Sequence, residues 1–307
     1  MKLHKYKDDF RDLISISAEW IGIPESAVYR DYYTVMMLEA LGDSTYADSC
    51  VFKGGTSLSK CYPGSIERFS EDIDLTYISD EELSNKQYNR ILKQIEKVMS
   101  HEGRIEKIPE ERNDRNKSSF VWFDDVAFAG KIKLEIGSSV RPDPYEKRAL
   151  KTYIQEYLEQ KGLNDAIRKY ELKNVCINTL SIERTFLDKV MSVKRHACCG
   201  TLPQKVRHIY DVTRLLDVQE VEDFLSNKEE LKRLTKLTKE TDYYYLEKRG
   251  VAEKYNPNED YSFSKWRCYF DESIRKRYEK LHEDLLYTSE KQDFDKAIKA
   301  FEIIDVI

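Results

Sequence analysis

Phe52-Lys-Gly-Gly-Thr-Ser-Leu-Ser-Lys60 and, a few residues later, Arg68-Phe-Ser-Glu-Asp-Ile-Asp-Leu75 are the two stretches that decide the fold of this chain. In the first, the apolar run Cys50 to Lys53 stops at two glycines, and the pattern predicts a short strand followed by a helix. Glycines let a phosphate approach the backbone closely, and the first turn of a helix presents N–H groups to it. A glycine pair also occurs in ordinary turns, so its meaning depends on what lies nearby.

Acidic residues at alternating positions follow the glycine pair. Asp72 and Asp74 are two apart in a segment that alternates with a period of two, so in a strand both carboxylates lie on one face. Glu135 has the same kind of position in a second predicted strand, Lys131 to Ile136. An Asp-x-Asp pair alone also fits a solvated strand edge. Three carboxylates beside a glycine-rich turn predict a site for Mg²⁺ or Mn²⁺ of the kind used in nucleotidyl transfer.

A basic segment lies further along the chain. Seven basic and three acidic residues between Glu183 and Arg214 give it a net charge of +4, in a chain whose net charge is −5. Lys189 follows an apolar pair, and Arg207 and Asp211 share one face of a predicted helix. A solvated helical hairpin would have the same composition. Together with the upstream motifs, the segment predicts a wall that binds a triphosphate.

Three other features of the second half have simpler explanations. Arg184 and Asp188 are four apart on a helix and predict a surface ion pair worth a few tenths of a kcal/mol. His208, beside Arg207, is expected to be structural or exposed rather than catalytic. The aromatic residues from Tyr261 to Phe270 and the run Tyr243-Tyr-Tyr245 predict core packing, with base stacking as the alternative.

The motifs taken together resemble a known family. Gly54-Gly55-Thr-Ser with Asp72-Ile-Asp74 resembles the signature of the DNA polymerase-β-like nucleotidyltransferase superfamily, although the gap between Gly55 and Asp72 is longer than in the general pattern. The longer stretches quoted above resemble the AbiEii/AbiGii-type toxin family within it. Three further segments match that family's later motifs in the same order: Lys131-Ile-Lys-Leu-Glu-Ile136, Glu183-Arg-Thr-Phe-Leu-Asp-Lys189 and Arg207-His-Ile-Tyr-Asp211.

The resemblance implies a metal-dependent nucleotidyltransferase that acts as the toxin of a bacterial toxin–antitoxin or phage-defence (abortive infection) pair. A nucleoside triphosphate would be the donor, an RNA such as the 3′ end of a tRNA the acceptor, and a cognate antitoxin protein the partner. The expected catalytic residues are Asp72, Asp74, Glu135, Lys189 and Asp211; the expected ligands of Mg²⁺ or Mn²⁺ are Asp72, Asp74 and Glu135; the expected nucleotide-binding residues are Gly54, Gly55, Thr56, Ser57, Lys189 and Arg207.

Two other functions are compatible with the same motifs. One is nucleotidyl transfer to a protein hydroxyl or to a small molecule. The other is a nucleotide-binding regulatory module without transferase activity, against which the complete set of three acids argues.

The pattern along the chain predicts an α+β fold with a small mixed or antiparallel sheet. Residues 1–144 are expected to form a nucleotidyltransferase domain with N-terminal helices at Asp8 to Trp20 and Pro24 to Leu41, a helix at Glu81 to Met99, and a hairpin of Phe120 to Phe128 and Lys131 to Ile136 joined at Ala129-Gly130. Residues 145–307 are expected to form a mainly helical domain that completes the active-site cleft, with a strand or connector at Val175 to Leu180 and helices at Ile182 to His196, Gln204 to Leu216, Val221 to Lys239 and Glu279 to Ile304.

Composition excludes several classes of protein. With 40% hydrophobic and 35% charged residues the chain can build a core, and its mild acidity argues against indiscriminate binding of polyanions. No run approaches the ~18 apolar residues of a membrane helix, and the N-terminus lacks the apolar region of a signal peptide, so we expect a cytoplasmic protein. The six cysteines form no Cys-x-x-Cys pair, and His196-Ala-Cys198-Cys199 lacks the second half of a zinc site.

Overall fold

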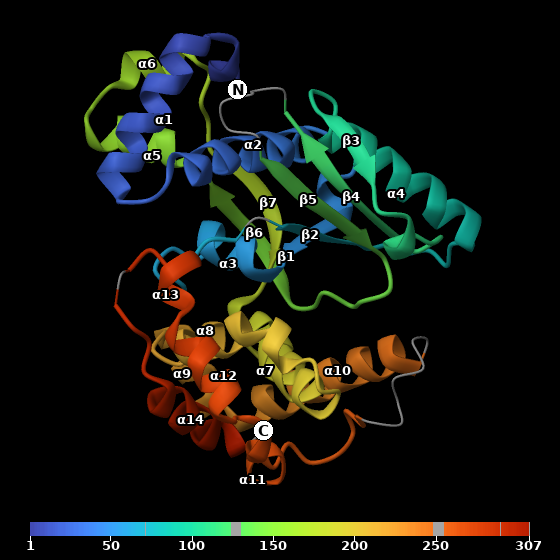
Figure 1. The fold of residues 1–307 in the computed structure, drawn as a ribbon. Helices are drawn as coiled ribbons and strands as arrows, with labels where there is room; N and C mark the ends of the chain where they lie inside the picture. Colours follow the sequence, from blue (N-terminus) through green and yellow to red (C-terminus); the bar gives the residue numbers. More distant parts are fainter. Residues whose placement is uncertain (71, 124–129, 248–254, 289, 307) are drawn as a thin grey trace. The chain divides into compact units, whose positions relative to one another are not determined.

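The chain folds into two compact units in the computed structural model, which describes all residues except 71, 124–129, 248–254, 289 and 307 (Figure 1). Unit 1 comprises Met1–Cys61 and Phe69–Leu180, and unit 2 comprises Tyr62–Arg68 and Ser181–Ile307. The chain therefore leaves unit 1 for a seven-residue segment before the strand that carries the paired aspartates.

Unit 1 contains a seven-stranded mixed sheet with the strand order β3-β4-β5-β2-β1-β7-β6. The β2–β5 and β1–β7 pairs are parallel and the other pairs are antiparallel. The strands are β1 (Cys50–Lys53), β2 (Asp72–Tyr77), β3 (Arg104–Lys107), β4 (Asn116–Trp122), β5 (Lys131–Gly137), β6 (Tyr145–Leu150) and β7 (Val175–Leu180).

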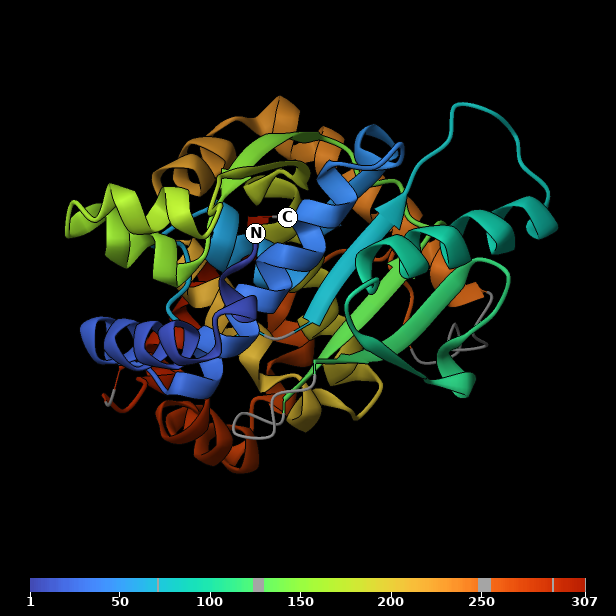
Figure 2. The same ribbon diagram turned by 90° about the horizontal axis from the view of Figure 1, so that it is seen from above.

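One face of this sheet forms the core of unit 1, because alternate side chains are apolar. Ile73 of β2 and Leu134 of β5 are buried there, and Phe123, just beyond β4, stacks on Tyr33 of α2 with ring centroids 4.0 Å apart. Helices α2 and α4 cover this face, whereas α1, α5 and α6 gather at the end of the sheet opposite α4 (Figures 1 and 2). The helices of unit 1 are α1 (Lys7–Ile21), α2 (Glu25–Gly42), α3 (Gly54–Cys61), α4 (Asn85–Met99), α5 (Tyr153–Gln160) and α6 (Asn164–Lys169).

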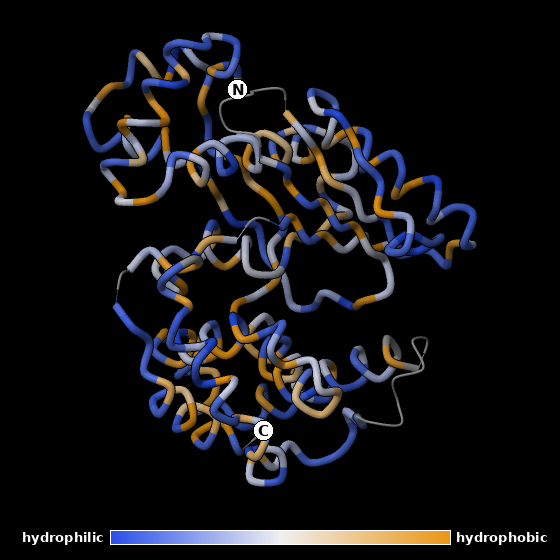
Figure 3. The backbone as a smooth tube through the Cα atoms, viewed as in Figure 1, coloured by the Kyte–Doolittle hydropathy of each residue, from blue (hydrophilic) through white to orange (hydrophobic). Residues whose placement is uncertain are grey.

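Unit 2 is helical in its described part. Helices α7 and α8 pack against each other, and α10 and α14 pack against this pair. The helices are α7 (Ile182–Cys198), α8 (Val206–Leu215), α9 (Gln219–Ser226), α10 (Lys228–Glu247), α11 (Phe263–Trp266), α12 (Glu272–Glu279), α13 (Leu281–Asp284) and α14 (Phe294–Ile303). Hydrophobic stretches run along the strands of unit 1 and through the helices of unit 2, whereas α4 is largely hydrophilic (Figure 3).

The predicted mixed α+β fold is confirmed, but the boundary between its two parts lies elsewhere. The sequence placed it at residue 144, whereas β6 and β7 continue the sheet of unit 1 as far as Leu180. Strand β6 was missed because Glu146, Lys147 and Arg148 make it look like a polar linker. Charged residues are common on such edge strands because they discourage pairing with other chains.

Several predicted helices are interrupted or begin later than their periodic patterns suggest. The predicted Val221–Lys239 helix is interrupted at Asn227, whose side chain accepts a hydrogen bond from the N–H of Glu230 at 3.2 Å. The predicted Glu279–Ile304 helix is not continuous either: α13 ends at Asp284, and α14 begins after Asp293, whose side chain caps it. Ser84 caps α4, and Pro24 immediately precedes α2 rather than beginning it.

The predicted hairpin is confirmed by the antiparallel pairing of β4 with β5, in which Trp122 lies opposite Lys131. Residues 124–128 of the predicted first strand and Ala129 of the predicted turn lie outside the described residues. No described helix combines the length and the apolar character that crossing a lipid bilayer would require.

Candidate active site

The glycine-rich turn of unit 1 lies at the junction that the sequence predicts: β1 ends at Lys53 and α3 begins at Gly54. Gly54 has a φ of +87°, a backbone conformation that residues with a Cβ rarely adopt. A Cβ at Gly54 would lie 2.3 Å from Oδ2 of Asp74, so this carboxylate packs directly on the turn. The structure thus brings the start of a helix and a carboxylate of the predicted metal pair into contact.

The hydroxyl groups of the turn are used within the protein. Thr56 Oγ1 donates a hydrogen bond to the carbonyl oxygen of Asp72 at 2.5 Å, and Ser57 Oγ donates to the carbonyl oxygen of Gly54 at 2.9 Å. Both side chains are buried. They fix the turn against the first residue of β2, which leaves the backbone N–H groups of the first turn of α3 as the predicted phosphate donors.

Asp72 and Asp74 are neighbours on the sheet face opposite the core. Asp74 lies opposite Lys53 of β1 on one side and Glu135 of β5 on the other, and Asp72 lies opposite Lys133 of β5. Residues in register on adjacent strands point to the same face. The two aspartates and Glu135 therefore share one face, as predicted.

The third carboxylate, that of Glu135, is ion-paired in this structure. Glu135 is ion-paired with Lys133, whose Nζ lies 2.5 Å from Glu135 and 2.8 Å from Glu111. Partial burial lowers the pKa of Lys133, but the hydrogen bonds and charges of the two glutamates outweigh this and raise it overall. Within the described ranges, no three Asp, Glu, His or Cys side chains gather closely enough to hold a metal ion. In this structure the ammonium group of Lys133 neutralises the charge of Glu135.

Two carboxylates remain that fit a divalent cation. Asp72 and Asp74 offer hard oxygen donors from alternate positions of one strand, which suits Mg²⁺ or Mn²⁺. The carboxylate of Asp74 also faces the helix start at Gly54, where an anion bound to the backbone would lie beside it.

In unit 2, three of the charged residues named above form a buried cluster. Arg68 Nε donates to Asp211 Oδ1 at 2.5 Å and its Nη2 donates to Oδ2 at 2.8 Å, while Lys189 Nζ lies 2.9 Å from Oδ2. Arg68 is 1% exposed and Asp211 is fully buried. Burial raises the pKa of Asp211, but the two cations outweigh it and lower the pKa to about 2. Asp211 is therefore ionised at neutral pH.

The cations around Asp211 affect one another. Burial, with the charges of Arg68 and Arg207, lowers the pKa of Lys189 against the opposing attraction of Asp211. Arg207, on α8, thus lies close enough for its charge to reach Lys189. The pKa of His208 is also lowered, by burial and by Lys189, so its ring is neutral at pH 7, and its Nδ1 lies 3.0 Å from Ser192 Oγ.

Two predictions about this segment change. Arg184 and Asp188 form the predicted ion pair at 3.1 Å, but it is partly buried: the Arg184 side chain is fully buried, whereas that of Asp188 is 36% exposed. The sequence motif that contains Arg68 predicts no role for it, but its guanidinium is the bidentate partner of Asp211. The signal was a lone arginine four residues before Asp72, and nothing in the sequence says that it would meet Asp211.

The C-terminal aromatic residues pack as the sequence predicts. Tyr261, Phe263, Trp266 and Phe270 are buried, and the ring of Trp266 lies 4.7 Å from that of Phe263, centroid to centroid. Of the run at 243–245, Tyr243 is exposed, and the other two side chains lie outside the described part of the structure. All six cysteines are free thiols.

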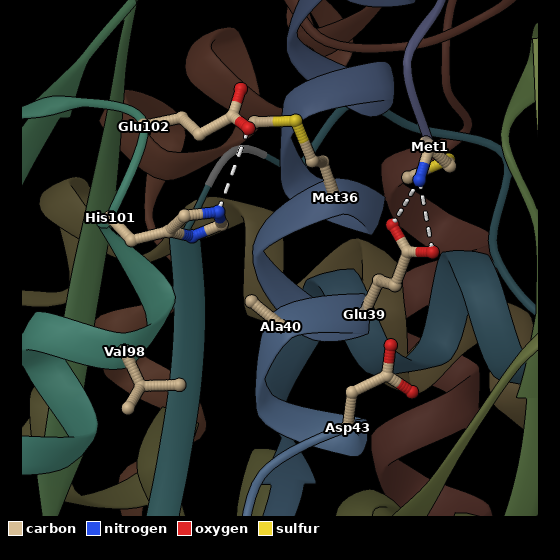
Figure 4. A pocket seen from close by; sticks show the side chains of 8 residues that line it. All are labelled: Met1, Met36, Glu39, Ala40, Asp43, Val98, His101 and Glu102. Atoms are coloured by element: carbon tan, nitrogen blue, oxygen red, sulfur yellow. Dashed lines mark hydrogen bonds and ion pairs between the residues drawn. The ribbon is translucent and has the colours of Figure 1, made fainter.

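A separate pocket of about 470 Å³ in unit 1 contains none of the motif residues (Figure 4). It lies along α2 and the end of α4, and Glu39 in it binds the amino group of Met1 at 2.8 Å. The residues that line it are Met1, Met36, Glu39, Ala40, Asp43, Val98, His101 and Glu102. Its position on α2, which covers the core face of the sheet, sets it apart from the acidic face.

Comparison with known proteins identifies the family. The sequence profile of the family described as "Nucleotidyl transferase AbiEii toxin, Type IV TA system" matches residues 37–300. The chain belongs to the AbiEii family. AbiEii proteins are nucleotidyltransferase toxins of toxin–antitoxin systems, and the chain is accordingly a nucleotidyltransferase that uses a nucleoside triphosphate. The expected family and the expected nucleotidyltransferase activity are thereby confirmed.

The solved structure of a nucleotidyltransferase toxin supports the fold of this AbiEii protein. The nucleotidyltransferase toxin MenT4 from Mycobacterium tuberculosis H37Rv is 15% identical, with a TM-score of 0.50 over 95% of this chain and 98% of that one. JHP933 from Helicobacter pylori is 18% identical, with a TM-score of 0.40 over 85% of this chain and 95% of that one. No curated protein matches the sequence.

Proposed function

We propose that this protein transfers a nucleoside monophosphate from a nucleoside triphosphate to the 3′ hydroxyl of an RNA, with tRNA as the acceptor, and that it requires Mg²⁺ or Mn²⁺. The observation that carries the proposal is the packing of the Asp74 carboxylate on Gly54, at the first turn of α3. A triphosphate bound by the backbone of that turn would lie beside the acid pair. In the cell, the protein would act as the toxin of a phage-defence (abortive infection) system, and an antitoxin would inhibit it.

The reaction forms one bond and breaks another at the α-phosphorus. The acceptor hydroxyl oxygen bonds to the α-phosphorus, the bond to the oxygen that bridges to the β-phosphorus breaks, and pyrophosphate leaves. A divalent ion held by Asp72 and Asp74 would supply neutralisation of the triphosphate charge. The backbone N–H groups from Gly54 to Ser57 would hold the β- and γ-phosphates.

Protein side chains would neutralise the charge of the pyrophosphate and accept the proton of the acceptor hydroxyl. Lys189 and Arg207 would neutralise the departing pyrophosphate, and Asp211, ionised between Arg68 and Lys189, would orient Lys189. Glu135 would accept the hydroxyl proton. Its carboxylate is ion-paired with Lys133, and that pair would have to open for the transfer. Unit 1 would thus act as the nucleotidyltransferase domain.

Incubation with Mg²⁺, each radiolabelled triphosphate in turn and total tRNA tests the proposal. We expect labelled RNA with the native protein and with Asp114→Asn, a control at an exposed position of unit 1, but none with Asp74→Asn or after chelation by EDTA. Label that migrates with protein or with a small molecule would show that the acceptor is not RNA. Triphosphate binding without release of pyrophosphate would indicate a regulatory module.

A further inference from the structure

The sheet face that carries Asp72 and Asp74 continues across β5 to β4. Phe120 of β4 lies opposite Lys133, which in turn lies opposite Asp72, and Trp122 lies opposite Lys131. These side chains therefore share the acidic face. The opposite face is the core, where Val121 is fully buried. Because strands are ~4.8 Å apart, Phe120 stands about 10 Å from Asp72 across the sheet.

Two cations lie over the two rings. Lys131 Nζ is 3.7 Å from the centroid of the Phe120 ring and 5.6 Å from that of Trp122, and Cζ of Arg104 on β3 is 6.0 Å from the Trp122 ring. Both rings are half-buried, whereas Lys131 and Arg104 are exposed. The indole Nε1 of Trp122 donates to Glu106 at 2.9 Å, which anchors the edge of the ring to β3.

This combination suits an unpaired nucleic acid strand. Proteins that bind single strands stack bases on aromatic rings displayed on a sheet face and attract the phosphates with nearby lysine and arginine. Phe120 and Trp122 are two positions apart, about 7 Å along the strand, so each can take a separate base. A donor nucleoside triphosphate has a single base, so a pair of rings indicates the acceptor strand.

We propose that Phe120 and Trp122, with Lys131 and Arg104, form a stacking platform for the unpaired 3′ end of the RNA acceptor. The inference rests on the proposed transfer to RNA, since it places the acceptor on the face that carries Asp72 and Asp74. The simpler role is internal: cation–π pairs across the strands can stabilise the sheet edge without any ligand. The two roles differ in what they predict for RNA binding. Stacking of a base requires a ring, so RNA binding should survive replacement of Trp122 by another aromatic residue but not by an aliphatic one.

Direct binding of RNA separates the roles without requiring catalysis. The full-length Asp74→Asn protein would be titrated into a 5′-fluorescein-labelled single-stranded RNA ten-mer ending in CCA, and fluorescence anisotropy recorded. Stacking is worth ~1–3 kcal/mol per base, so Trp122→Leu should weaken binding by about 5- to 150-fold, whereas Trp122→Phe should retain most of the affinity. The control is Trp20→Leu, which removes a 37% exposed tryptophan of α1 and should bind like the parent.

Three further measurements complete the test. Phe120→Leu should also weaken RNA binding, blunt-ended duplex RNA should compete poorly, and Trp122→Leu should leave the affinity for the triphosphate alone unchanged. Thermal denaturation establishes that each variant is folded. Equal affinity of Trp122→Leu and the parent protein would overturn the platform, and so would equal losses in the Leu and Phe variants at position 122.

The outcomes also separate this inference from the proposed function. If label transfer to RNA succeeds while the Leu variants bind RNA normally, the platform is wrong and the function stands. If RNA binding depends on Trp122 while label is transferred to another acceptor, the strand-binding face stands and the transfer to RNA is wrong.

Discussion

Replacing Arg68 with alanine should destabilise unit 2 far more than replacing Arg214, an arginine that also joins the 62–68 segment to α8. The guanidinium of Arg68 makes two hydrogen bonds to Asp211, at 2.5 and 2.8 Å, and both groups are almost completely buried. Removing one partner of a buried pair costs ~3–5 kcal/mol when the other charge is left uncompensated. Lys189 still lies 2.9 Å from Asp211, so we expect a loss near the lower end of this range. That is a large share of the ~5–15 kcal/mol by which a folded protein is usually stable.

The chain contains a matched control for this substitution. Arg214 of α8 lies 3.2 Å from Glu67, so it also joins the 62–68 segment to α8, but its side chain and that of Glu67 are 33% and 54% exposed. An exposed pair contributes ~0–1 kcal/mol. Urea denaturation gives the free energies of unfolding, and hydrogen–deuterium exchange of α8 shows whether the loss lies in unit 2.

The pKa of Asp211 adds an independent prediction about pH. A fall from the ordinary 3.8 to about 2 corresponds to roughly 2 kcal/mol of stability at ~1.4 kcal/mol per unit. Because the folded pKa is depressed, this stability is present above pH 4 and is lost as the pH falls towards 2. The free energy of unfolding of the native protein should therefore fall more steeply over this range than that of Asp211→Asn. Parallel pH profiles, or an Arg68→Ala loss no larger than that of Arg214→Ala, would refute the reasoning.

Two further substitutions test unit 1. Gly54→Ala should abolish transfer and lower the melting temperature, because the new Cβ would clash with Asp74 and the backbone has a φ of +87°. The control is Gly64→Ala, at a φ of +81° with nothing within 4 Å of its Cβ. It should lose only ~1 kcal/mol of stability, from the backbone conformation, and keep its activity. Lys133→Gln should release Glu135 and lower the Mg²⁺ concentration that gives half-maximal transfer several-fold, whereas Lys107→Gln, at an exposed position of β3, should not. An unchanged Mg²⁺ requirement would show that the Lys133 ion pair does not compete with the metal ion.

The local features of the site could be predicted from the sequence because they depend on near neighbours. The turn at Gly54 and the common face of Asp72 and Asp74 follow from glycine chemistry and the period of a strand, and both are present. That Glu135 shares the face with Asp74 also follows from the alternation, once β2 and β5 pair in parallel.

The long-range features could not be predicted. The pairing of Arg68 with Asp211 joins residues 143 positions apart, and no periodicity encodes it. The bond from Lys133 to Glu135 is local, but a strand pattern does not tell whether a carboxylate binds a metal ion or a neighbouring lysine. Strand β6 was missed because an edge strand has charged residues where a buried strand has apolar ones.

Sequencing of RNA 3′ ends from bacteria that express the protein tests the central claim most directly, because it reports the acceptor and the added nucleotide together. We predict that induction of the native chain adds nucleotides to tRNA 3′ ends and arrests growth, and that Asp74→Asn does neither, whereas Asp114→Asn does both. Unchanged 3′ ends in cells arrested by the native protein, with no arrest by Asp74→Asn, would contradict RNA as the acceptor. Arrest of equal strength by Asp74→Asn would contradict the catalytic role of the carboxylate packed on Gly54.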